Sequence, residues 1–331
     1  MKSVLRYLVA FALCAATALW FPEPSQAQAQ SSSSAWPTRP VRFVLPLGPG
    51  SGVDVTARLL ADRLSKMWGQ PVVVENRPGG DSIVAMTTVI GANDDHILLM
   101  TPASSFTAHP YLHASLPYKF SDLKPIARVS NTIVVVAVPA DLGVSSIKDL
   151  VAKIKAAPGK LNWATATGAN DLMFAGWLKA AGLDMAKVPY KNTVDAVGDL
   201  AQNRIQAYVA AYAIVRPRVQ EGKVKILALS NSKRAPSMPD VPTSIELGAP
   251  ELTLDGLVGL LGPMSLSDSV RDKIAADVIT VMKDSEVVAK LEPGGQVISP
   301  GASKEFADEI NSQREAVAKI GDGLGVKKAK E

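Results

Sequence analysis

The sequence predicts an α/β protein of two domains, in which helices flank mainly parallel sheets. The chain has 331 residues, which suits two domains of about 150 residues each. It is 47% hydrophobic and 20% charged, the composition of a folded globular protein. Short apolar runs alternate with segments of helical period, as expected for parallel strands that are joined and covered by helices.

In the first half, residues 41–47 form an apolar run that predicts a buried strand. Residues 53–68 carry apolar side chains at helical spacing and predict an amphipathic helix. Further short strands are expected at 71–74 and 97–100. The Gly/Pro segments between these elements predict loops.

In the second half, the β-branched run 133–138 predicts a clear strand. Ser146, followed three residues later by Asp149, has the pattern of a capping box and predicts the start of a helix. Strands are also expected at 162–166, 205–210 and 225–229, and helices at 171–181, from Thr193, from Ser267 and at 306–320.

The N-terminus has the pattern of a secretory signal peptide. Lys2 and Arg6 precede an apolar run at 7–20, and small residues follow. A transmembrane anchor is the alternative, but fourteen apolar residues are fewer than the about 20 that span a bilayer. We therefore expect a cleaved signal at 1–29, a flexible spacer at 30–35 and a protein located in the periplasm.

Composition argues against several functions. The net charge is +4 with scattered charges and only 5% aromatic residues, so nucleic-acid binding is not expected. Cys14 is the single cysteine, which excludes disulfide frameworks and thiol catalysis. His109 and His113 lie four residues apart, but Pro110 between them argues against a metal-binding helix. We expect no metal, no cofactor and no catalytic residues.

The Gly-rich segment 48–52 is the first candidate site. It joins a predicted strand to a predicted helix, so its N–H groups can face an anion at the positive end of that helix. An ordinary tight turn is the alternative. A dinucleotide site is disfavoured, because Val53 stands where the fingerprint needs its third glycine and Pro49 lacks a donor.

The segment 167–171 is the second candidate, and it also leads from a strand into a helix. Asn170 and Asp171 are good N-cap residues, and capping alone is the alternative role. Two anion-favouring helix starts, one in each half of the chain, suggest a cleft that holds a ligand between two lobes.

Several short motifs, in this order and spacing, resemble the Bug-type extracytoplasmic solute receptors, the TctC-like binding components of tripartite tricarboxylate transporters. The resemblance covers residues 36–326 and implies a two-lobed periplasmic-binding-protein fold, type II-like, that closes on a small organic carboxylate without catalysis. The motifs are WPTRPVR (36–42), LPLGPGSGVD (45–54), QPVVVENRPG (70–79), LPY (116–118), PGKLN (158–162), VPYK (188–191) and PDVPT (239–243).

The resemblance also implies where the ligand sits, in the loops 48–54 and 166–171. Where the family's second loop carries hydroxyls and a histidine, this chain has Asp171, Leu172 and Met173. Ala210 and Ala211 stand where the family often has an aspartate. These changes favour an apolar, aromatic or amine-bearing carboxylate over a tricarboxylate. The expected ligand-binding residues are Leu47, Pro49, Gly50, Ser51, Gly52, Asp54, Ser104, Ser105, Thr167, Gly168, Ala169, Asn170, Asp171, Tyr190 and Ala210.

We expect lobe 1 to comprise residues 36–131 and 232–331, and lobe 2 residues 132–231, with the ligand cleft between them. The expected function is capture of the carboxylate by hinge closure and transient delivery to membrane permease subunits, by a monomeric receptor. The alternatives are a receptor that signals to a membrane sensor, or a secreted hydrolase on a similar scaffold.

Overall fold

The computed structural model describes residues 36–166, 168–190 and 193–329. The expected signal peptide and spacer lie outside these residues, as does Thr167 of the second candidate loop. None of the described helices combines the length and apolar character needed to cross a bilayer.

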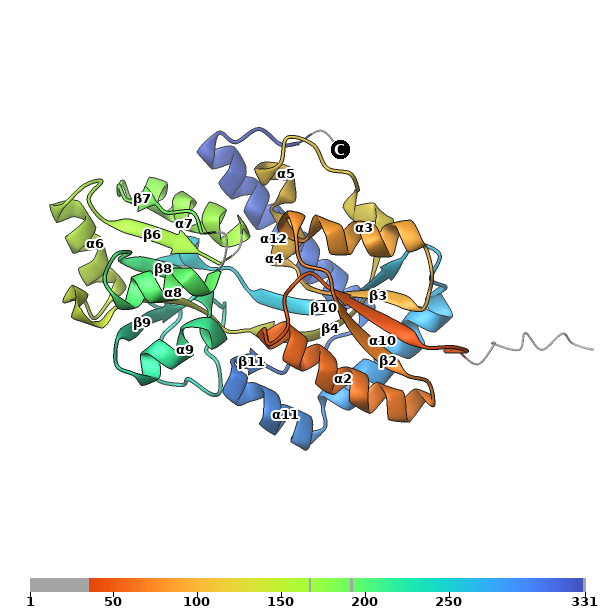
Figure 1. The fold of residues 1–331 in the computed structure, drawn as a ribbon. Helices are drawn as coiled ribbons and strands as arrows, with labels where there is room; N and C mark the ends of the chain where they lie inside the picture. Colours follow the sequence, from red (N-terminus) through yellow and green to blue (C-terminus); the bar gives the residue numbers. More distant parts are fainter. Residues whose placement is uncertain (1–35, 167, 191–192, 330–331) are drawn as a thin grey trace, which may run out of the picture. The chain divides into compact units, whose positions relative to one another are not determined.

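The first sheet has six strands in the order β11-β4-β10-β3-β1-β2 (Figure 1). The strand β1 is parallel to its neighbours β2 and β3, whereas β10 is antiparallel to both β3 and β4, and β11 to β4. The strands are β1 (Val41–Leu45), β2 (Val72–Asn76), β3 (Ile97–Pro102), β4 (Leu123–Thr132), β10 (Gly256–Pro263) and β11 (Gln296–Val297).

The second sheet has five strands in the order β7-β6-β8-β5-β9. The strand β6 is parallel to β7 and β8, and β5 is antiparallel to β8 and β9. The strands are β5 (Val134–Pro139), β6 (Asn162–Thr165), β7 (Ala186–Lys187), β8 (Ala207–Ala211) and β9 (Val224–Leu229).

The predicted α/β class and the division into two sheets are confirmed, but both sheets are mixed rather than mainly parallel. The chain enters the second sheet at β5 and returns to the first sheet at β10. Each of these two strands is antiparallel to both of its neighbours. The strands β4 and β10 were not predicted from the sequence, and three glycines in β10 obscure its pattern. A Cβ at Gly259 would overlap the ring of Phe306, so that position needs a glycine.

Serine caps begin three of the helices; those at Ser146 and Ser267 were predicted from the sequence, whereas the one at Ser51 was not. Ser51, Ser146 and Ser267 are extended, and each side chain accepts a hydrogen bond from the N–H three residues later. These caps start α2 (Gly52–Trp68), α6 (Ile147–Ala156) and α10 (Asp268–Met282). The other α-helices are α3 (Ile83–Ala92), α4 (Ser104–Thr107), α5 (His109–Leu112), α7 (Gly168–Ala180), α8 (Thr193–Ala201), α9 (Tyr212–Gln220), α11 (Ser285–Leu291) and α12 (Ser303–Leu324).

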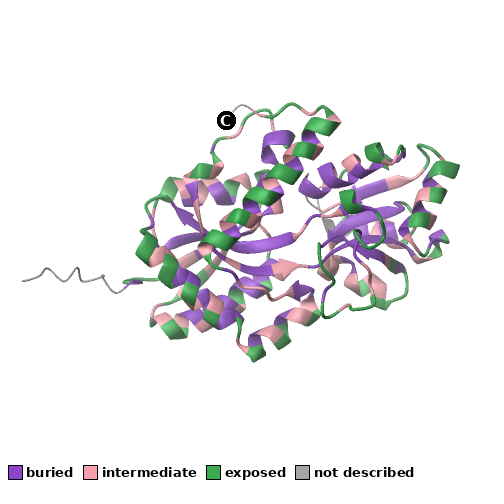
Figure 2. Ribbon diagram, turned by 180° about the vertical axis from the view of Figure 1, so that it is seen from behind, coloured by how far each residue is buried: buried purple, intermediate pink, exposed green. Residues whose placement is uncertain are grey.

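Both faces of the second sheet are buried, as the continuous apolar run of β5 predicts. Val134, Val136 and Val138 pack into one cluster with the aromatic residues of α7, and Val135 and Ala137 pack into another with α8 and α9. This alternation follows the two-residue period of a strand. Figure 2 shows buried strands and exposed outer faces on the helices.

The chain passes from the first sheet to the second between Thr132 and Val134. After β9 it stays against the second sheet: the N–H of Leu229 donates to the carbonyl of Pro242, and Leu252 and Leu254 pack beside α7. It enters the first sheet again at Gly256. The return, expected near Ser232, therefore lies at residues 254–256, because the apolar side chains before it are buried on the second sheet.

The helix α12 packs on both cores. Phe306 and Ile310, near its start, join the core of the first sheet, whereas Val317 joins the cluster that contains α7. A Cβ at Gly321 would overlap the ring of Tyr111, so this end of the helix also lies close to α5. The two lobes are thus joined by packing as well as by the two chain crossings.

Candidate ligand-binding site

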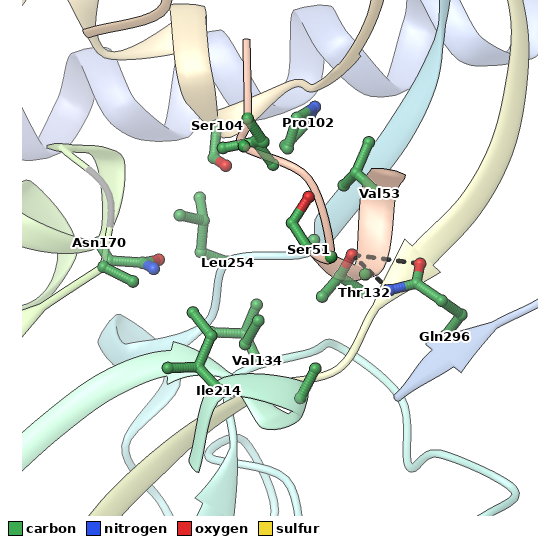
Figure 3. Close-up of a pocket in the computed structure, with 18 of the residues that line it drawn as sticks. Ser51, Val53, Pro102, Ser104, Thr132, Val134, Asn170, Ile214, Leu254 and Gln296 are labelled. Atoms are coloured by element: carbon green, nitrogen blue, oxygen red, sulfur yellow. Dashed lines mark hydrogen bonds between the residues drawn. The ribbon is translucent and has the colours of Figure 1, made fainter. Parts of the chain in front are cut away.

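A cavity of about 530 Å³ lies where segments from the two sheets meet (Figure 3). This volume is within the range of small-molecule sites, about 300–1,000 Å³. The lining residues are Leu47, Gly48, Pro49, Gly50, Ser51, Gly52, Val53, Pro102, Ser104, Thr132, Val134, Ala166, Asn170, Ala211, Ala213, Ile214, Leu254, Asp255, Gly256 and Gln296.

One wall is the loop that leads from β1 into α2. Gly50 has φ +83°, a conformation that favours glycine, and the Ser51 side chain caps the N–H of Asp54. Among the described residues, the N–H groups of Gly52 and Val53 have no acceptor. Because α2 is 17 residues long, its positive end and these free donors form a place for an anion.

Asp54 turns away from this wall and does not line the cavity. Its carboxylate accepts hydrogen bonds from the N–H of Gly50 at 2.9 Å, from Arg58 at 3.0 Å and from Asn76 at 2.9 Å. Burial alone would raise the pKa of Asp54, but the hydrogen bonds from Arg58, Gly50 and Asn76 outweigh it and hold the pKa below its usual value. Asp54 therefore fixes the shape of the loop, and its charge is paired with Arg58.

Asn170, in the first turn of α7, is the polar group of the opposite wall. It is 4% exposed, and Figure 3 shows it entering the cavity from the side opposite Ser51 and Val53. Its Oδ1 atom is buried without a hydrogen-bond partner among the described residues. A buried acceptor of this kind is costly unless a donor reaches it, so a ligand donor is well placed there.

Asp171, next to Asn170, does not face the cavity. Its carboxylate pairs with the Lys187 ammonium at 2.8 Å and accepts a hydrogen bond from the Thr165 hydroxyl at 2.6 Å. The negative charge expected beside the ligand is thus paired elsewhere. Asp171 is therefore no obstacle to an anionic ligand.

The middle of the cavity is apolar. Val134, Ile214 and Leu254 lie between the two polar walls, with Pro102 near Ser104. This surface suits the apolar body of a ligand whose polar groups reach the walls.

The two segments that join the lobes, together with the strand β11, supply further polar groups. The Gln296 amide donates to the Thr132 hydroxyl at 3.2 Å and accepts from Ser130 at 2.8 Å. Asp255 accepts from the Ser232 N–H at 3.0 Å and from the Asn131 amide at 3.3 Å. Asp255 is the one charged residue of the described lining, which holds no lysine or arginine.

The structure brings seven of the expected site residues to the cavity: Leu47, Pro49, Gly50, Ser51, Gly52, Ser104 and Asn170. Thr167 lies outside the described residues. The residues that do not line the cavity are Asp54, Ser105, Gly168, Ala169, Asp171, Tyr190 and Ala210.

Local contacts explain why some of these residues do not line the cavity. Ala210 points into a core, and its neighbour Ala211 faces the cavity instead, because successive residues of a strand face opposite sides. The Tyr190 hydroxyl donates to Asp199 at 2.7 Å, and burial together with this bond raises the pKa of Tyr190 to about 12. Ser105 is buried, whereas its neighbour Ser104 lines the cavity.

Several lining residues were not predicted from the sequence. Thr132 and Val134 directly follow Asn131, near which the first crossing was predicted, and a crossing that borders the cleft could have suggested them. Leu254 and Asp255 were missed because the second crossing was placed too early. Gln296 belongs to a two-residue strand that has no signal in the sequence.

The comparisons with known proteins agree with this architecture. The family model described as Tripartite tricarboxylate transporter family receptor matches residues 56–321. Protein BugT of Bordetella pertussis is 30% identical over 302 residues, 88% of this chain and 93% of BugT.

Two solved structures show the same periplasmic-binding-protein fold. Periplasmic binding protein BugD has a TM-score of 0.76 at 26% identity, over 88% of this chain and 99% of that one. The structure of R. palustris Rpa4515 with adipate has a TM-score of 0.80 at 22% identity, over the same shares. The predicted two-lobed fold and the resemblance to Bug-type receptors are confirmed.

Proposed function

Because this chain belongs to the tripartite tricarboxylate transporter receptor family, we propose that it is a periplasmic receptor that captures a small organic carboxylate and delivers it to a permease of that transporter type. The observation that carries this proposal is the wall formed by the start of α2. The free N–H groups of Gly52 and Val53 offer two donors to a carboxylate at the positive end of the helix. No lysine or arginine is required.

The opposite wall narrows the ligand class. A ligand that places its carboxylate at α2 reaches Asn170 with its other end, where the buried Oδ1 atom accepts a hydrogen bond. A hydroxyl or an amine supplies that donor, and the apolar middle of the cavity takes a hydrocarbon body. The ligand class is thus a hydroxy- or amino-substituted carboxylate.

The position of the two walls supports capture by hinge closure. The α2 wall belongs to lobe 1 and Asn170 to lobe 2, so a ligand that touches both stabilises the closed arrangement. The crossing segments at 132–134 and 254–256 line the same cavity, and we place the hinge in these segments.

Catalysis has little support in this cavity. The described lining contains no histidine, lysine or cysteine, so the hydroxyls of Ser51 and Ser104 have no imidazole beside them to act as a base.

A thermal-shift screen tests the proposal. The protein is first stripped of bound ligand by unfolding and refolding, and is then heated with monocarboxylates, dicarboxylates, hydroxy acids, amino acids and citrate. A ligand at 100 times its Kd adds about 2.7 kcal/mol to the stability of the folded state. At about 2 °C per kcal/mol this shifts Tm by about 5 °C.

We expect such a shift with a hydroxy- or amino-substituted carboxylate, and none with the matching ester or alcohol. A flat response to every carboxylate would contradict the proposed ligand class. A measured shift together with unchanged uptake in a deletion strain would contradict delivery to a permease and favour a sensing role.

A further inference from the structure

Outside the cavity, three potential metal ligands converge beside the second lobe. The His113 Nε2 atom lies 3.1 Å from the Oδ2 atom of Asp81, and the His109 Nε2 atom lies 3.6 Å from the same oxygen. One ligand atom from each residue lies within 4.8 Å of the others. Asp81 comes from the segment after β2, whereas His109 begins α5 and His113 directly follows it.

From the sequence, Pro110 argued against a helix that would align the two imidazoles for a metal, but the structure has a helical turn there and the two rings lie side by side. The helix α5 is a single turn with the proline at its start, where a missing N–H costs little. The rings of His109 and His113, on either side of the proline, pack edge to face with centroids 5.1 Å apart.

His109 provides the independent sign of a ligand. It is 1% exposed, and its Nε2 atom is buried with no hydrogen-bond partner among the described residues, although it faces Asp81 and His113. Its other ring nitrogen, Nδ1, lies 2.6 Å from the hydroxyl of Tyr118. When Nδ1–H donates to Tyr118, the Nε2 lone pair points into the cluster, which is how an outer partner orients a metal-bound histidine.

We propose that Asp81, His109 and His113 form a binding site for a divalent transition-metal ion, with Zn²⁺ as the preferred ion. Two imidazole nitrogens and one carboxylate oxygen are a common zinc donor set. Tetrahedral coordination with ligand bonds of about 2.0–2.1 Å places neighbouring ligand atoms about 3.3 Å apart. The two distances to Asp81 Oδ2, 3.1 and 3.6 Å, lie on either side of this value.

Access to this zinc site is open from one side. The Asp81 side chain is 42% exposed and the His113 side chain 28%, so an ion from solvent can reach the buried His109 between them. Three protein ligands leave a fourth position for water or for another group. The Oδ2 atom of Asp81 also lies near the start of α7, 3.7 Å from the position of a Cβ on Gly168. The site therefore borders the second lobe.

A second cluster, Asp94, Asp95 and His96, does not have these properties. The His96 Nδ1 atom already lies 2.6 Å from Asp95, and Asp94 is bound to Arg39 at 2.6 Å and to the N–H of His96. Its polar atoms are engaged, and the guanidinium of Arg39 repels a cation. This cluster supplies the control variant.

The test is calorimetric titration of Zn²⁺ into untagged protein expressed from the whole sequence and treated with EDTA. Co²⁺ is added in parallel, because tetrahedral coordination gives it a visible absorption band. We expect one Zn²⁺ per chain. In Asp81→Asn and His113→Gln the affinity falls about tenfold or more, since both remove a direct ligand. Asn tolerates the left-handed backbone that Asp81 adopts, with φ +52°, so this variant keeps the loop.

The control variant Asp95→Asn, in the other cluster, keeps the full affinity. Because His109 is buried, the test relies on the two more exposed ligands, and circular dichroism verifies that each variant is folded. Absence of Zn²⁺ binding at micromolar concentration would overturn the proposal. Equal affinity in the parent, Asp81→Asn and His113→Gln would also overturn it, because the ion would then bind elsewhere.

Discussion

Proline in place of Gly52 tests whether the start of α2 holds the ligand. Gly52 is the first residue of α2, and its N–H makes no bond within the helix. Proline is favoured at this position. The preceding residue, Ser51, has φ −65° and ψ 155°, an extended conformation that suits a residue before proline. Gly52→Pro therefore removes one donor from the cavity and leaves the helix intact.

The expected loss follows from the hydrogen bond that disappears. A bond from an N–H to a charged acceptor is worth about 1.5–3 kcal/mol. At 1.4 kcal/mol for each factor of ten, Gly52→Pro raises Kd about 10- to 150-fold. The assay is calorimetric titration with the carboxylate that gives the largest thermal shift.

Two controls separate the lost donor from other effects. Gly52→Ala keeps the N–H and adds a Cβ 3.0 Å from the Gln296 side chain, so it reports steric cost alone. Asp268→Pro makes the same change at the first residue of α10, whose cap Ser267 has nearly the same angles, φ −67° and ψ 153°. We expect Asp268→Pro to bind like the parent. A Kd for Gly52→Pro within about twofold of the Gly52→Ala value would refute the role of this N–H.

Further predictions concern the opposite wall, the first loop and the core. Asn170→Leu removes the unpartnered buried oxygen, so we expect the Tm of the ligand-free protein to rise and the affinity for the carboxylate to fall about tenfold. A fall in both Tm and affinity would contradict the role of this oxygen as an acceptor for the ligand. Asp54→Asn destabilises the protein at neutral pH. Because the folded-state pKa of Asp54 is depressed, its stabilisation is present above the unfolded value of 3.8 and is lost as the pH falls through the folded value. The stability gap between parent and Asp54→Asn in urea denaturation should therefore close below about pH 4, and a constant gap would exclude this linkage. Gly259→Ala costs about 1–3 kcal/mol because its Cβ meets Phe306. Gly91→Ala, on an open face of α3, stabilises the folded state by up to about 1 kcal/mol. Equal shifts of the urea midpoint in the two variants would contradict the packing argument.

The features that the sequence predicts well are set by neighbours along the chain. A serine cap depends on the residue three positions later, and an apolar period of two or 3.6 depends on one segment. The starts of α2, α6 and α10 and the buried strand β5 could therefore be predicted from the sequence. The Gly-rich loop at 48–52 and Asn170 were found for the same reason, since each marks the start of a helix.

The direction of each side chain depends on residues that are distant in the sequence. Asp54 and Asp171 look like ligand contacts beside their loops, but Arg58 and Lys187 draw them away from the cavity. Ala210 and Ala211 exchange roles because pairing with β5 sets which face of β8 is buried. No pattern within one segment carries this information.

By itself the sequence determined the α/β class, several of the helix starts and two segments of the candidate cavity, because capping and periodicity are local. Only the tertiary structure decided the rest. Strand pairing made both sheets mixed. The return of the chain at 254–256 places Leu254 and Asp255 at the cavity, and Gln296, from near the C-terminal end of the sequence, also lines it. Tertiary packing likewise places Asp81 beside His109 and His113. These contacts join residues tens to hundreds of positions apart, and only the packing of one buried surface on another selects them.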